Sequence, residues 1–189
     1  MGTPKPGVLL PDGRPMMAHV LETLGAVCHQ VAVSGHTAHH AEDHPLPPSL
    51  IRIPDLRPGQ GPLAALEAIL ASRLDSRYLV VSCDQPLLTA ALLYRLASQT
   101  PASETGIPGF FCAINQAGKR LLDPFPGIYP DHLLGDVQRA LDAGHRSIRD
   151  CIRPWESHAV PVSSDEEQQL KSMNTPADIE ALFRAQGSR

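Results

Sequence analysis

Apolar residues recur along this chain in two alternating patterns. Residues 15–24, 89–98 and 131–141, and a stretch that begins at Pro62, carry apolar side chains three or four positions apart, the spacing of a helix with one buried face. A last helix is expected over 176–185. Short apolar runs typical of buried strands lie between the helices, at 30–35, 50–54, 78–82, 110–114 and 157–162. Strands that alternate with helices predict an α/β fold, with a mostly parallel sheet covered by helices on both faces.

One domain is expected over residues 1–189, because the chain is long enough for one core and no repeat or long linker divides it. No apolar run approaches the roughly 18 residues of a membrane span, so no membrane partner is expected. The net charge of −4, without a basic stripe, argues against nucleic acid as a partner. Four separated cysteines without a Cys-x-x-Cys pair predict a reducing, cytoplasmic location.

The stretch 80–88 carries the clearest candidate chemistry. A buried strand ends there at Asp84, and Pro86 follows two residues later. In open α/β sheets, ligands bind at the C-terminal ends of the strands. A carboxylate at that place suits Mg²⁺ that carries nucleotide phosphates, because Mg²⁺ prefers one or two carboxylates plus phosphate oxygens. From this stretch alone, a solvated turn or a helix N-cap at Thr89 remains the alternative.

Two further loops stand at the ends of elements. Residues 55–61 carry Asp55 and two glycines directly before a helix, where glycines allow close approach and free amides can face an anion. In residues 172–178, Asn174 or Thr175 caps a helix that has Asp178 in its first turn. Capping alone is a sufficient explanation of this third loop, so its functional role stays open.

Several other features have structural interpretations that we favour over functional ones. A solvated surface helix is favoured over a transition-metal site for His36, His39, His40 and His44, because no cysteine lies among them and His39 and His40 are adjacent. Cys83 fits a small packing residue better than a nucleophile, since no histidine is placed to activate it. Residues 165–169 predict an exposed helix face. Trp155 is expected to pack in the core or against a loop.

Six segments of the chain resemble one family, in the family's order. They are Met1-Gly2-Thr3-Pro4-Lys5 with Asp12-Gly13-Arg14-Pro15, then Asp55 with Gly61-Pro62-Leu63-Ala64, then Cys83-Asp84-Gln85-Pro86, then Asp123-Pro124-Phe125-Pro126-Gly127-Ile128-Tyr129, then Gly144-His145-Arg146-Ser147-Ile148-Arg149, and Asn174-Thr175-Pro176-Ala177-Asp178-Ile179. The fourth is a looser match, to a His-Pro-Leu-x-x-x-Tyr pattern. The chain thus resembles the molybdenum cofactor guanylyltransferases, which are MobA-like NTP transferases, and their molybdopterin nucleotidyltransferase relatives.

The resemblance implies a single-domain, Rossmann-like nucleotide-diphospho-sugar transferase fold and an enzyme. The implied reaction is Mg²⁺-dependent transfer of GMP from GTP to molybdopterin, or the molybdenum cofactor, with release of pyrophosphate. It makes Asp84, as metal ligand, and Lys5, as phosphate partner, the catalytic residues. It assigns nucleotide binding to Gly2, Lys5, Ser34, Asp55, Gly61, Pro62 and Asp84, and binding of the pterin substrate to Asn174 and Thr175. Other cofactor-biosynthesis or molybdoenzyme-chaperone proteins are further expected partners.

The chain departs from the family at its start. Family members begin with a strand and a glycine-rich loop, and we expect a start assigned too far downstream, with roughly 15–20 residues of strand and loop preceding it. Without that strand the sheet loses a central ladder and phosphate-binding amides, which predicts poor folding or no transferase activity. Ser34 and Ser172 stand where the family has asparagines, which shortens two polar side chains. A cytidylyltransferase, a sugar-phosphate nucleotidyltransferase and a non-catalytic nucleotide- or molybdopterin-binding relative remain alternatives.

Overall fold

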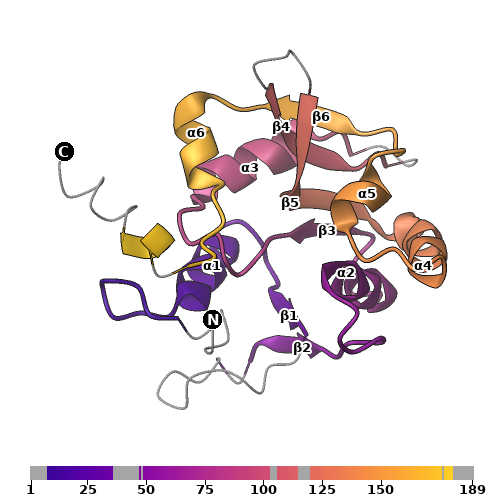
Figure 1. Cartoon of the computed structure of the whole chain (residues 1–189), viewed down its shortest axis with the longest axis horizontal. Helices are drawn as coiled ribbons and strands as arrows, with labels where there is room; N and C mark the ends of the chain where they lie inside the picture. The colour runs from indigo at the N-terminus through magenta and orange to yellow at the C-terminus, as the bar shows by residue number, and fades with distance from the viewer. Residues whose placement is uncertain are drawn as a thin grey trace.

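The computed structural model describes residues 8–35, 47, 49–102, 106–114, 120–175 and 177–180, and Figure 1 shows their arrangement. In chain order the elements are α1 (Met16–Gly25), β1 (Ala32–Ser34), β2 (Ile51–Ile53), α2 (Pro62–Ala71), β3 (Arg77–Val80), α3 (Ala90–Gln99), β4 (Gly109–Ile114), β5 (Arg120–Pro130), η3 (Asp131–Leu133), α4 (Leu134–Asp142), α5 (Ile148–Ile152), β6 (His158–Pro161) and α6 (Ser164–Gln169). None of the helices in these ranges has the length and apolar character that crossing a membrane requires.

The elements predicted from hydrophobic spacing are present close to their expected positions. Thr89 is the N-cap of α3, where its hydroxyl accepts a hydrogen bond from the Leu92 amide. α6 has no buried residue, which confirms an exposed helix at 165–169. Of the helix predicted over 176–185, residues 177–180 are helical and the others lie outside the described residues. The histidines at 36, 39, 40 and 44 also lie outside them.

The described strands form two sheets. β1 pairs with β2 in parallel, and the other sheet has the order β3-β5-β4-β6. In that larger sheet β5 is antiparallel to both β3 and β4, whereas β4 and β6 are parallel. The α/β class is therefore confirmed. The expectation of a mostly parallel sheet is corrected, because the four-stranded sheet is mixed.

β5 is the strand that the sequence did not predict. Its three prolines interrupt the usual strand pattern, since proline cannot donate to a ladder and is normally excluded from central strands. The register explains how they are tolerated. Phe110 pairs with Gly127 while Phe111 pairs with Asp123, so residues 124–126 bulge out of the ladder. Two of the prolines, Pro124 and Pro126, lie in this bulge, where a missing amide costs no ladder hydrogen bond.

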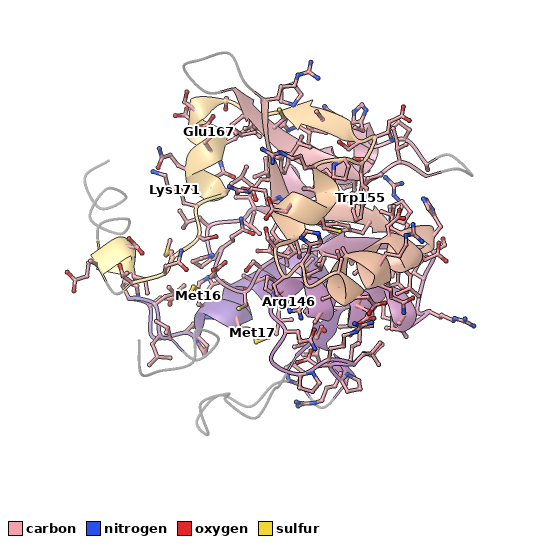
Figure 2. The ribbon with its side chains drawn as sticks, turned by 45° about the vertical axis from the view of Figure 1, so that its right-hand side comes forward. Met16, Met17, Arg146, Trp155, Glu167 and Lys171 are labelled. Carbon is pink, nitrogen blue, oxygen red and sulfur yellow. The ribbon has the colours of Figure 1, made fainter. Side chains whose placement is uncertain are left out.

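Two apolar layers cover opposite faces of the four-stranded sheet. Phe110 and Phe111 are adjacent in β4 and therefore point to opposite faces. Phe110 lies in a cluster with residues of α2, α4 and α5, and Phe111 in one with residues of α1, α3 and β6. Trp155, which Figure 2 labels, packs edge-on against Tyr129. Their ring centroids are 6.5 Å apart. The expected helices on both faces and the packing role of Trp155 are confirmed.

An apolar cavity of about 620 Å³ lies between β1 and β3. Residues of both strands line it, together with apolar side chains of α1 and α2 such as Leu21 and Ile69. Within the described residues, β1 is paired only with β2, and β3 only with β5, so each strand has one edge without a ladder. Figure 1 shows the β1–β2 pair set off from the larger sheet.

Candidate functional site

Asp84 lies in the loop that follows β3, and its side chain is held in place. The residue is only 9% exposed, and the Ser82 hydroxyl donates a hydrogen bond of 2.6 Å to Oδ1. The loop is closed by a backbone bond from the Gln85 amide to the Ser82 carbonyl. The predicted buried strand is corrected, because only Val80 of β3 is buried and its other residues are partly exposed. A carboxylate that a hydroxyl orients in the loop after β3 is a hard oxygen donor of the kind that Mg²⁺ accepts.

Gln85 fastens this loop to two distant segments. Its buried amide nitrogen Nε2 donates to the carbonyl of Phe125 in the β5 bulge at 2.8 Å, and to the carbonyl of Leu170 after α6 at 2.7 Å. The sequence indicates no role for Gln85 beyond its place in the motif Cys83-Asp84-Gln85-Pro86. Its partners lie 40 and 85 positions along the chain, so no local pattern could have identified them.

The segment with Asn174 and Thr175 lies against the Asp84 loop. The amide of Met173 donates to the carbonyl oxygen of Asp84 at 2.7 Å. The amides of Asn174 and Thr175 donate to Oδ2 of Asp178, and the Asp178 amide donates to the Thr175 hydroxyl. The hydrogen bond with the Thr175 side chain, followed by those from the two backbone amides, lowers the pKa of Asp178. The predicted helix cap is therefore confirmed, and Asn174 directly follows Met173, whose amide bonds to the Asp84 loop.

Asp55 borders a second cavity, at the end of β2. This cavity, of about 570 Å³, is lined by Gly35, Arg52, Ile53, Pro54, Asp55, Pro58 and Gly59. Oδ1 of Asp55 is buried, and no described residue donates a hydrogen bond to it. Because a buried carboxylate oxygen without a donor is costly, this atom is suited to a hydroxyl or amino group of a ligand. Gly35 borders the same place: a side chain added there would lie 3.9 Å from Oδ1 of Asp55. The φ of 104° at this residue favours glycine.

Ser34 lies at the end of β1 but faces the larger cavity. Its hydroxyl donates to the carbonyl of Ala65 in α2 at 3.4 Å, and the residue lines the cavity between β1 and β3. Ser82 and Cys83 line the same cavity. The structure thus brings Ser34 and the Asp84 loop to one cavity, whereas Asp55 lines the other. The placement of Cys83 on an apolar wall agrees with its packing interpretation.

The loop 55–61 is anchored to two helices. Arg57 forms ion pairs with Glu67 in α2, where Nε and Oε2 are 3.0 Å apart, and with Asp142 in α4, where NH1 and Oδ1 are 2.6 Å apart. Gly61 is the N-cap of α2 with a φ of 79°, and Pro62 occupies the first turn. The predicted helix start is confirmed. The backbone oxygen of Arg146 (Figure 2) would lie 3.8 Å from a side chain added at Gly61, so residues of the 144–149 segment adjoin this loop.

The remaining predicted site residues, Gly2 and Lys5, lie outside the described residues. Across the described ranges, no group of three or more histidine, cysteine, aspartate or glutamate side chains is placed to hold a metal ion. A site with one or two carboxylates fits Mg²⁺ on a nucleotide, because the phosphates and water supply the other ligands. Asp84 therefore suits this ion.

The fold is shared with solved structures of other proteins. It matches the molybdopterin-guanine dinucleotide biosynthesis protein A of Archaeoglobus fulgidus with a TM-score of 0.75 and 20% identity, over 100% of this chain and 93% of that one. It also matches the 2-C-methyl-D-erythritol 4-phosphate cytidylyltransferase of Thermus thermophilus, with a TM-score of 0.64 and 16% identity, over 96% of this chain and 94% of that one. These likenesses define the fold of this chain as the α/β fold of the two proteins.

The sequence defines the family more narrowly. The pattern of the MobA-like NTP transferase domain matches residues 1–162, and the chain belongs to this family. The probable molybdenum cofactor guanylyltransferase of Rhodopirellula baltica is 30% identical over 187 residues, which is 97% of this chain and 85% of that protein. The molybdenum cofactor guanylyltransferase of Pseudomonas aeruginosa PAO1 is 27% identical over 179 residues, 93% of this chain and 84% of that protein. The resemblance of the chain to this family is confirmed.

Proposed function

We propose that this chain transfers GMP from GTP to molybdopterin, or the molybdenum cofactor, in a Mg²⁺-dependent reaction that releases pyrophosphate. The observation that carries the proposal is the Asp84 carboxylate, which Ser82 orients in the loop after β3. It is supported by similarity over nearly the whole chain to relatives that are named guanylyltransferases. The transferred group passes when a phosphate oxygen of molybdopterin attacks the α-phosphorus of GTP and the bond to the departing pyrophosphate breaks.

The phosphate end of GTP is assigned to Asp84, Lys5 and the start of α2. Bound Mg²⁺ would neutralise charge on the triphosphate, and Asp84 would hold it. Lys5 would pair with the phosphates as a mobile point charge. The amides after Gly61 and Pro62 would face an anionic group. Because such a transfer depends on positioning and charge neutralisation, it requires no protein nucleophile.

The two other parts of the substrates are assigned to separate places. The nucleoside is assigned to the cavity beside Asp55, whose buried Oδ1 would accept a hydrogen bond from a sugar hydroxyl or a base amino group. Ser34 would contact the nucleotide from the end of β1. Molybdopterin is assigned to Asn174 and Thr175, because their segment is joined to Asp84 through the Met173 amide. This arrangement would bring the pterin phosphate to the triphosphate.

Equilibrium binding of GTP and CTP, each with and without Mg²⁺, tests the proposal. We expect Mg²⁺-dependent GTP binding that Asp84→Asn weakens by about tenfold, the size that loss of a metal-site residue produces. Asp165→Asn, which changes an exposed carboxylate in α6, serves as the control and should bind like wild type. A preference for CTP would favour a cytidylyltransferase. Failure of a folded protein to bind either nucleotide with Mg²⁺ would contradict the transferase.

A further inference from the structure

Asp123 is a carboxylate that sequence analysis did not place in the site, and the β5 bulge sets its position. Asp123 pairs with Phe111 at the last regular position before residues 124–126 leave the ladder. The family pattern quoted above has histidine at this place, so the carboxylate is a departure of this chain. Bulges commonly re-aim a side chain next to an active site. The contacts of the bulge therefore decide where Asp123 can act.

The bulge is held by hydrogen bonds and by close packing. The Tyr129 hydroxyl donates to the Pro124 carbonyl at 2.6 Å, and Gln85 Nε2 donates to the Phe125 carbonyl. At Gly127, an added side chain would come within 2.7 Å of the Pro124 carbonyl, so only glycine fits there. Gln85 directly follows Asp84 in the chain. The hydrogen bond from Gln85 Nε2 to the Phe125 carbonyl therefore holds the β5 bulge against the Asp84 loop.

One oxygen of the Asp123 carboxylate is used within the bulge and the other is not. Oδ1 accepts a hydrogen bond from the Phe125 amide at 3.2 Å. No described residue donates to Oδ2. Burial raises the pKa of Asp123, and the negative charge of Asp84 raises it further. The hydrogen bond from the Phe125 amide and the charge of Arg149 act in the opposite direction, but the pKa remains raised, so the surroundings disfavour the ionised carboxylate. Two half-buried or buried carboxylates that repel each other are stabilised when a cation lies between them.

We propose that Asp123 is a second protein ligand of the cation that Asp84 binds, presented to it by the β5 bulge. The inference rests on the proposed function, because it concerns the same Mg²⁺. One or two carboxylates plus phosphate oxygens is the ligand set that this ion prefers in nucleotide sites, and the second carboxylate completes it. Asp84 comes from the loop after β3 and Asp123 from β5, so the ion would tie together two adjacent strands of the mixed sheet.

Binding of Mn²⁺, as a paramagnetic substitute for Mg²⁺, tests this inference without turnover. Free Mn²⁺ is measured by electron paramagnetic resonance during titration of wild type, Asp84→Asn, Asp123→Asn and the control Asp165→Asn. Asparagine at 123 keeps an oxygen that can accept from the Phe125 amide, so the bulge should be retained. We expect Asp84→Asn and Asp123→Asn each to weaken Mn²⁺ binding by about tenfold, and Asp165→Asn to leave it unchanged. Thermal unfolding of each variant verifies that it is folded, and Asp123→Ser replaces Asp123→Asn if the latter is not.

The two proposals fail in different ways. If Asp84→Asn weakens Mn²⁺ binding and a folded Asp123 variant binds like wild type, Asp123 is not a ligand and the proposed function stands. If a folded Asp84→Asn variant also binds like wild type, the cation role of Asp84 fails and the proposed function fails with it. Competition by Mg²⁺ for the same site completes the test, because a site that excludes Mg²⁺ would overturn the inference.

Discussion

The four-stranded sheet and the β1–β2 pair support their parts of the site in different ways. The four-stranded sheet has helices on both of its faces. The Asp84 loop is held to it by the Gln85 side chain, which bonds to Phe125 in β5 and to Leu170 after α6, 40 and 85 positions further along the chain. β1 and β2 pair only with each other among the described strands and border an apolar cavity. The proposed cation end of the site is thus built by its own sheet. The nucleoside end, at Ser34 and Asp55, depends on α2 and on loop contacts such as the Arg57 ion pairs.

Filling the cavity between the two regions should have the largest effect. The change is an N-terminal extension that carries an apolar strand and a glycine-rich loop of the family type. We expect it to raise the free energy of unfolding by several kcal/mol, because a strand there buries the cavity walls and pairs with both edges. We also expect tighter Mg²⁺-dependent GTP binding, since a glycine-rich loop adds phosphate-binding amides. Chemical denaturation and equilibrium binding measure the two effects.

The control for this extension is one of equal length made of serine and glycine, which cannot fill an apolar cavity. Hydrogen exchange locates the effect. Amides of β1 and β3 should become protected with the apolar strand and not with the control. Equal stability and equal protection of the two extended chains would show that the two sheets do not need a strand between them.

A matched pair of valines compares the packing of the two regions directly. Val160 in β6 is fully buried, whereas Val33 in β1 lines the cavity. We expect Val160→Ala to lower the free energy of unfolding by roughly 2 kcal/mol and Val33→Ala by less than about 1 kcal/mol, because the cost depends on how many contacts are lost. Urea denaturation measures both. Equal losses would mean that β1 is packed as tightly as the larger sheet.

The smallest effect concerns the cap beside the Asp84 loop. The folded state lowers the pKa of Asp178 below its usual 3.8, so it favours the ionised carboxylate. The resulting stabilisation is present above pH 3.8 and is lost as the pH falls through the folded-state pKa. Asp178→Asn cannot titrate, so the Tm difference between wild type and this variant should be greatest near neutral pH and shrink in acid. A difference that is constant with pH would exclude the ionised cap.

Sequence reasoning predicted the helices, the strand that leads to Asp84 and the cap at Thr175, because each depends on local spacing or on neighbours within four residues. It missed β5, because three prolines are a strong local signal against a strand and the bulge that accommodates two of them is formed with β4. The mixed sheet followed from that strand and was missed with it. The role of Gln85 was missed for the same reason, since it depends on contacts with distant segments. The proposed role of Asp123 depends on the bulge that β5 forms with β4.

The sequence by itself determined the α/β class, the family and the position of Asp84 after a strand, because hydrophobic period and short motifs are local properties of a chain. The tertiary structure alone decided which segments meet Asp84. The β5 bulge and the segment 173–175 reach it through Gln85 and Met173, and the cavity beside β3 separates it from β1. These are long-range contacts, and their selection depends on how the whole chain packs rather than on any one stretch of it.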